Sequence, residues 1–285
     1  MVRLTRSRFL RQLTAGFLGL FCALVFAACG SSTTPAGGDA ASTGASPAAG
    51  GAADTLTFAI EPTFAPFEFN DSNGQLTGFD VDLLNAIGKE AGFTVNYQTA
   101  QFDGMIPALQ AGTIDGAISA MTIKPERAQV VDFSRPYYRS GLAIAVQSSN
   151  TDITSFDHLS GKRIAAQTGT TGASKAEEAN GDVRLFDNLP LALQELSNGN
   201  VDAVVHDAPA ILYAIKTGSV KNIKTVGDLL TEEYYGIPLP KGSPNLERVN
   251  QGLTAIIENG TYAEIYRKWF GAEPPELPET APGIQ

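Results

Sequence analysis

One arginine and one aspartate in this sequence have side chains suited to holding the two charged groups of a small ligand. Arg127 lies in the run TIKPER at 122–127, and its guanidinium fork could hold a carboxylate through two parallel hydrogen bonds. Its spacing alone favours an arginine on a solvated helix face. Asp207 follows the apolar run 201–206. A carboxylate at the carboxyl end of a parallel strand opens toward a cleft and could pair with an ammonium group, although Asp207 also suits the N-cap of a helix that begins near Ala208.

The elements that must position these side chains alternate between strands and helices. Short apolar strands are predicted at 56–60, 93–97, 114–118, 163–166, 183–186 and 201–205. Helical periodicity falls between them, at 78–91, 105–111, 172–180, 190–198 and 208–217. Strands and helices that alternate at this spacing predict an α/β fold with largely parallel sheets covered on both faces.

Two extended apolar segments interrupt this alternation and indicate a chain of two lobes. They lie at 141–146 and 235–240, and they enclose a self-contained α/β block. We therefore expect lobe 1 to comprise 54–142 plus 239–275, lobe 2 to comprise 147–235, and 276–285 to be a C-terminal tail. Two strands that cross between two lobes would form a hinge beside a cleft.

Composition excludes several classes of function. The chain has 285 residues with 43% apolar residues, and 20 Lys+Arg against 30 Asp+Glu give a net charge of −10. Nucleic-acid binding through a basic face is therefore not expected. With two Cys and two His, the chain has almost nothing from which to build a metal site or a disulfide framework, and no cofactor is expected.

The N-terminal residues resemble an export signal followed by a linker. Four arginines precede an apolar stretch of about 16 residues, which is short for a membrane span. This stretch ends in FAACG at 26–30, which resembles a lipobox and predicts a signal peptide at 1–28 with Cys29 as a lipidated mature N-terminus. Ordinary cleavage or an uncleaved anchor are the alternatives. Residues 29–53 are almost entirely Gly, Ala, Ser, Thr and Pro, which is typical of a flexible tether.

A series of short motifs between residues 56 and 270 resembles a known family. In chain order they are FAPFEF at 64–69, GFDVDL at 78–83, IPALQ at 106–110, DFS at 132–134, YY at 137–138, HD at 206–207, NGTY at 259–262 and KWFG at 268–271. Together they resemble the polar amino-acid-binding proteins of bacterial ABC importers, solute-binding family 3, most closely the glutamine-binding type. The resemblance implies a type II periplasmic-binding-protein-like fold that closes on its ligand outside the membrane and delivers it to a permease and, through it, an ATPase.

The resemblance also implies roles for individual residues. Arg127 matches the position that binds the ligand α-carboxylate, where Thr122 and Thr170 would add hydroxyl and backbone N–H donors. Thr170 also precedes a predicted helix, whose free N-terminal amides attract an anionic group. Asp207 and Ser119 would receive the α-ammonium. The remaining matches are aromatic residues that clasp the aliphatic stem and a histidine typical of the glutamine-binding branch, namely Phe64, Phe102 and His206.

Departures from the glutamine pattern bear on the ligand. This chain has Glu61 where the family commonly has Asp, and Gln167 where the glutamine-binding branch has Lys. A buried Glu61 without a cationic partner favours a ligand that supplies positive charge, such as arginine, lysine or histidine. The run 119–122, which includes Ala120, also resembles the small-residue loop of basic amino-acid binders. The resemblance as a whole favours glutamine, so both ligands stay open here.

Two other functions are compatible with the same resemblance. One is a periplasmic enzyme of the cyclohexadienyl dehydratase type, for which Glu61 would be a candidate acid. The other is an amino-acid sensor component that acts on a separate receptor. Arg127 and Asp207 match the amino-acid clamp, so we expect a monomeric binding protein with no catalytic residue.

Overall fold

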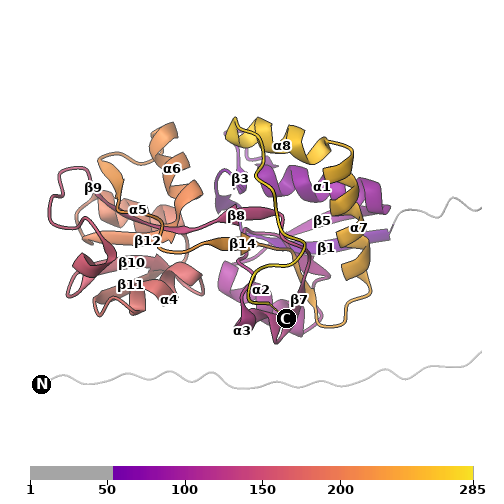
Figure 1. The fold of residues 1–285 in the computed structure, drawn as a ribbon, viewed down its shortest axis with the longest axis horizontal. Coiled ribbons are helices and arrows are strands. Elements are labelled where there is room, and N and C mark those ends of the chain that lie inside the picture. Colours follow the sequence, from indigo (N-terminus) through magenta and orange to yellow (C-terminus); the bar gives the residue numbers. More distant parts are fainter. Residues whose placement is uncertain (1–53, 285) are drawn as a thin grey trace, which may run out of the picture. The chain divides into compact units, whose positions relative to one another are not determined.

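The computed structural model describes residues 54–284, and Figure 1 shows their fold. The predicted signal peptide, the lipidation site at Cys29 and the tether lie outside these residues. Within 54–284, the longest helices are too short or too polar to cross a membrane. Two lobes, each with a sheet and helices around it, make up the described part of the chain.

Lobe 1 is built around a parallel sheet with the strand order β5-β1-β6. Its strands are β1 (Asp54–Ile60), β5 (Phe93–Thr99) and β6 (Gly116–Ala117), so that the expected strand 114–118 is shorter than predicted. The surrounding helices are α1 (Phe79–Ala91), α2 (Met105–Gln110), α7 (Asn245–Glu258) and α8 (Thr261–Phe270). Smaller elements complete the lobe: β2 (Thr63–Phe64), β3 (Glu68–Asn70), β4 (Leu76–Thr77), η1 (Phe102–Gly104), α3 (Pro125–Ala128), β7 (Val131–Phe133) and β15 (Pro238–Pro240).

Lobe 2 contains a five-stranded sheet with the order β11-β10-β12-β9-β13. Its strands are β9 (Leu142–Gln147), β10 (Arg163–Gln167), β11 (Asp182–Phe186), β12 (Ala203–Asp207) and β13 (Ile223–Val226). Its helices are η2 (Phe156–Leu159), α4 (Thr171–Glu177), α5 (Leu189–Ser197) and α6 (Ala208–Thr217). Strands β10, β11 and β12 are parallel, whereas β9 and β13 add antiparallel pairs.

The segments that cross between the lobes differ from those expected. β8 (Tyr138–Ser140) and β14 (Glu233–Tyr235) pair with each other and connect the lobes (Figure 1). The segment 141–146, expected to cross, instead lies almost wholly in β9, in the sheet of lobe 2 between β12 and β13, and β15 pairs with β7 in lobe 1. An apolar run without alternation needs cover on both faces, which the sheet of a lobe provides and an exposed crossing segment does not.

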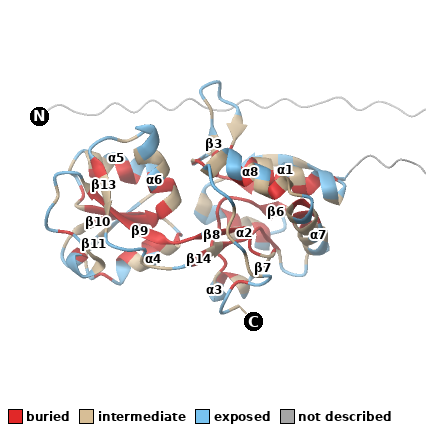
Figure 2. Ribbon diagram, turned by 45° about the horizontal axis from the view of Figure 1, so that its top comes forward, coloured by how far each residue is buried: buried red, intermediate tan, exposed pale blue. Residues whose placement is uncertain are grey.

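A cluster of aromatic rings anchors the crossing strands to lobe 1. The ring of Phe67 lies 4.9 Å from Tyr138 of β8 and 5.4 Å from Tyr235 of β14, measured between centroids. Phe270 of α8 lies 5.0 Å from Tyr138. Figure 2 shows buried residues at the centres of the sheets and in the crossing strands. This packing gives the hinge a firm base on one side.

The C-terminal segment packs on lobe 1, although the sequence indicated only a tail there. It crosses lobe 1 in Figure 1, and Ala281 is buried. Glu279 forms an ion pair with Arg135 at 2.8 Å. These contacts join the end of the chain to the segment that leads into β8.

Candidate ligand-binding site

The structure brings all eleven ligand-binding residues predicted from the sequence into the lining of one pocket between the lobes. Lobe 1 provides Glu61, Phe64, Phe102, Ser119, Ala120, Thr122 and Arg127, and lobe 2 provides Gln167, Thr170, His206 and Asp207. Sequence analysis missed two further lining residues, Glu68 and Thr171. Glu68 belongs to the motif at 64–69 and Thr171 follows Thr170, so both were within reach of the motifs. The part that each residue plays in binding stays a prediction.

Arg127 is buried in the pocket wall, so the alternative of a solvated helix face does not apply. Its exposed fraction is 7%, and burial lowers the pKa of its guanidinium to about 10. Nη1 donates to the carbonyl oxygen of Thr122 at 2.8 Å, and Nη2 donates across the lobes to the carbonyl oxygen of Gly169 at 2.9 Å. The guanidinium carbon also lies 5.4 Å from the ring centre of Phe102. Of the five N–H groups of a guanidinium, those not used here could bind a carboxylate.

Asp207 ends β12 and directs its carboxylate toward the hinge. Although Asp207 precedes α6, its side chain makes no capping hydrogen bond, so the N-cap alternative does not describe its carboxylate. Oδ1 accepts hydrogen bonds from the hydroxyl groups of Tyr235 at 2.5 Å and Ser140 at 3.4 Å. Both donors come from the crossing region, so the position of this acid is tied to the hinge.

A hydrogen-bonded chain of three side chains links the lobes at the other end of the pocket. The backbone N–H of Asp207 donates to Nδ1 of His206 at 2.8 Å, and the same nitrogen lies 2.9 Å from Oδ2 of Asp207. Nε2 then donates to Oε1 of Gln167 at 3.0 Å. Nε2 of Gln167 donates to Oε2 of Glu61 at 2.7 Å and to the carbonyl oxygen of Asp187 at 3.2 Å.

Glu61 is the acidic group in this hydrogen-bonded chain. Its exposed fraction is 5%, and burial raises the pKa of its carboxyl above the ordinary value of 4.5, against the opposing effect of hydrogen bonds from Gln167 and Thr63. None of the ion pairs within 54–284 involves Glu61. The carboxyl group therefore has neutral donors and spare acceptor capacity.

The two threonine hydroxyl groups donate to the protein, which differs from the expectation that they face a ligand carboxylate. The Thr122 hydroxyl donates to Oε2 of Glu233 at 2.6 Å. The Thr170 hydroxyl donates to the carbonyl oxygen of Gln167 at 2.7 Å and accepts the N–H of Ala173, which caps α4. Arg127 and backbone N–H groups are thus the donors left for an anionic group.

Glu233 is a buried carboxylate in β14 that sequence analysis did not single out. Its Oε2 accepts a hydrogen bond from Thr122 of lobe 1 and another from Thr171 of lobe 2, the latter at 2.9 Å. The sequence around it reads only as an extended segment, which gave no signal for this role. Together with the hydrogen bonds of Arg127 and Gln167 across the lobes, these contacts define a closed arrangement of the two lobes.

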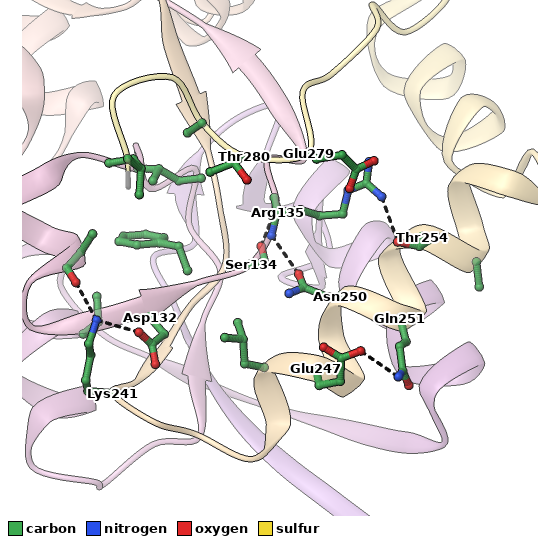
Figure 3. A pocket seen from close by; sticks show the side chains of 18 of the residues that line it. Asp132, Ser134, Arg135, Lys241, Glu247, Asn250, Gln251, Thr254, Glu279 and Thr280 are labelled. Carbon is green, nitrogen blue, oxygen red and sulfur yellow. Dashed lines mark hydrogen bonds and ion pairs between the residues drawn. The ribbon is translucent and has the colours of Figure 1, made fainter.

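A larger and more open cavity lies elsewhere on lobe 1, between β7, α7 and the C-terminal segment (Figure 3). None of the eleven predicted residues lines it. Two ion pairs lie in its wall, Lys241 with Asp132 and Arg135 with Glu279, and Glu247 accepts a hydrogen bond from Gln251. Within the described residues, no cluster of three His, Cys, Asp or Glu side chains could hold a metal ion.

The chain is similar to proteins that bind amino acids. It is 34% identical to a probable histidine-binding protein of Neisseria gonorrhoeae over 258 residues, which cover 88% of this chain and 92% of that protein. A solved structure of an ancestral arginine-binding protein bound to arginine is 45% identical, with a TM-score of 0.73 and coverage of 76% of this chain and 98% of the other. A second structure, of an ancestral arginine-binding protein bound to glutamine, is 44% identical, with a TM-score of 0.74 and the same coverage.

A family description matches nearly all of both lobes. The family is described as bacterial extracellular solute-binding proteins, family 3, and the match covers residues 56–272. It spans most of the chain and includes every residue of the pocket lining. The two-lobed α/β architecture and the position of the pocket agree with this match. The chain therefore belongs to the bacterial extracellular solute-binding proteins, family 3.

Proposed function

We propose that this chain is the extracytoplasmic substrate-binding component of an ABC importer and that it binds a polar L-amino acid between its lobes. Arg127 has unused guanidinium donors for the α-carboxylate, and Asp207 and Ser119 supply acceptors for the α-ammonium. Phe64 and Phe102 would line the aliphatic stem. The amino-acid-binding names of similar proteins support this class of ligand.

We propose that the preferred ligand is a basic amino acid, arginine or lysine before glutamine. The observation that carries this choice is the set of bonds around Gln167, whose amide hydrogens are used by Glu61 and by the carbonyl oxygen of Asp187. Glu61 and Gln167 thus offer acceptors to a ligand side chain and no free amide donor. A guanidinium or ammonium group only donates, whereas the amide oxygen of glutamine would need a donor.

The charge of Glu61 favours the same order of ligands, with a basic amino acid before glutamine. A cationic side chain beside Glu61 would replace the hydration that this buried carboxyl has lost, while an uncharged amide would leave most of the loss in place. Glutamate and aspartate would place a second carboxylate beside Glu61 and should be rejected.

We also propose how the bound ligand reaches the importer. The closed protein would present its ligand to a permease, which works with an ATPase, and Cys29 would carry the lipid that holds the protein at the membrane. We propose a monomer that binds its ligand without chemical turnover. Recovery of the bound amino acid in unchanged form would separate binding from an activity of the dehydratase type.

Glu61→Gln tests the proposed ligand preference. Isothermal titration of the purified full chain should show that this variant loses at least tenfold in arginine affinity, since a charge-assisted hydrogen bond becomes a neutral one. Its affinity for glutamine should change by less than about threefold. The matched control is Glu177→Gln, because Glu177 is exposed in α4 and lines no part of the pocket. Equal losses for both ligands would contradict a cation-binding role for Glu61.

A further inference from the structure

Beneath the pocket lie two carboxyl groups that have no cationic partner. Glu68 and Asp80 each have an exposed fraction of 0%. Glu68 also lines the pocket, and Asp80 lies in the first turn of α1. Neither takes part in any of the ion pairs of the described chain.

Each carboxyl group uses one oxygen and leaves the other without a hydrogen-bond partner. Oδ2 of Asp80 accepts from the backbone N–H of Ala120 at 2.9 Å and from the hydroxyl of Tyr137 at 2.8 Å. Oε1 of Glu68 accepts from the hydroxyl of Ser119 at 2.6 Å. The second oxygens, Oδ1 of Asp80 and Oε2 of Glu68, are buried and unpaired. Two unpaired buried carboxylate oxygens are costly, and a proton held between the two groups removes that cost.

The surroundings of the pair favour keeping such a proton. The titratable groups that face it are Glu61 from the turn after β1, Tyr97 from β5 and Tyr137 from the segment before β8, and none of them is a cation. Burial, together with the charge of Asp80, raises the pKa of Glu68 well above its ordinary value, and burial raises the pKa of Asp80. Asp80 is the better anion of the two, because it accepts two hydrogen bonds and lies at the N-terminus of α1.

We propose that Glu68 and Asp80 share one proton and that the pair positions the loop 119–122 at the pocket wall. Glu68 carries the proton and directs it to Asp80, and each carboxyl then fixes one residue of the loop. The part of this inference that concerns the ligand rests on the proposed function, in which Ser119 is an acceptor for the α-ammonium.

The loop 119–122 contains an unfavourable backbone conformation that hydrogen bonds from outside the loop stabilise. Ala120 has a φ of 48°, a left-handed conformation that is rare and unfavourable for a residue with a Cβ atom. The carboxylate of Asp80 holds its backbone N–H. The hydroxyl hydrogen of Ser119 points to Glu68, and its oxygen accepts the backbone N–H of Glu61 at 3.3 Å, which leaves one lone pair to accept from a ligand. The pair therefore makes the loop present a hydrogen-bond acceptor, the Ser119 oxygen, to the pocket.

The first test needs no ligand. In the full wild-type chain, infrared spectra at neutral pH should contain the carbonyl band of a protonated buried carboxylic acid, and Glu68→Gln should remove that band. The free energy of unfolding should fall as the pH rises above the ordinary carboxyl pKa, because the folded state keeps a proton that the unfolded state releases. Glu68→Gln should flatten this dependence, and the exposed control Glu177→Gln should retain both the band and the slope.

The second test measures arginine affinity by isothermal titration at a fixed pH. The Glu68→Leu variant should bind arginine at least tenfold more weakly than wild type, since Ser119 and Asp80 both lose their partner. Glu68→Gln should restore affinity to within about threefold of wild type, because its amide donates to Asp80 and its oxygen accepts from Ser119. A wild-type spectrum without the acid band, or the same pH slope in wild type and Glu68→Gln, would overturn the shared proton. If wild type binds no amino acid although the band and slope are present, the proposed function fails and the proton pair stands.

Discussion

Gln167 is the residue on which the proposed ligand preference depends. Its amide bridges His206 and Glu61, so Glu61 is the acid that this end of the pocket offers to a ligand side chain. A lysine at the same position, as in the glutamine-binding branch that the sequence resembles, would supply an ammonium group to Glu61. The pocket would then already contain the cation that the proposed ligand brings.

Gln167→Lys should therefore reverse the ligand preference. We expect at least a tenfold loss of arginine affinity, because two cations would compete for one buried carboxylate, and a smaller change or a gain for glutamine. Isothermal titration with both ligands measures this directly. Gln167→Met is the matched control, because it removes the hydrogen bonds without adding charge. Arginine affinity that survives the lysine substitution would mean that Glu61 does not contact the ligand side chain.

At the scale of elements, the turn into α1 connects the pocket to the core of lobe 1. Gly78 has a φ of 141°, and a Cβ atom there would lie 1.9 Å from the carbonyl oxygen of Phe67. The backbone N–H groups of Phe79 and Asp80 donate to the carbonyl oxygens of Pro66 and Phe67. The motifs at 64–69 and 78–83 thus meet at one close backbone contact.

Gly78→Ala should destabilise the protein by more than about 3 kcal/mol, because the backbone itself would have to move. Gly74→Ala is the control: its φ of 75° is also left-handed, but a Cβ atom would meet nothing within 4 Å, so we expect a loss of about 1 kcal/mol. Urea unfolding of both variants measures the difference. Similar losses at the two positions would show that strain in φ, rather than the contact with Phe67, restricts Gly78.

The sequence predicted the elements and the pocket members better than their connections. The alternation of strands and helices predicted the parallel strands of both sheets, and the motifs predicted eleven of the residues that line the pocket. The apolar run 141–146 is predicted to cross because an extended apolar segment has the same pattern in a sheet and between lobes. The hydroxyl directions of Thr122 and Thr170 and the contact of Glu68 with Asp80 depend on tertiary packing, which local patterns do not encode.

For the molecule as a whole, the described structure is a closed pair of lobes joined by β8 and β14. Glu233 accepts hydrogen bonds from both lobes, and Asp207 is bonded to hydroxyl groups of the crossing region. Closure around the proposed charged ligand would remove water from Arg127, Asp207 and Glu61, which would strengthen their interactions with it. The proposed ligand-binding groups and the hinge therefore share side chains.

The most direct test of this account is a titration series on the purified full chain with arginine, lysine, histidine, glutamine and glutamate. The protein should first be unfolded and refolded to remove any amino acid carried over from expression. We predict that arginine or lysine binds at least tenfold more tightly than glutamine and that glutamate does not bind. Glutamine as the tightest ligand would contradict the assignment of Glu61 to a cationic group, and no binding of any of the five would contradict the amino-acid site itself.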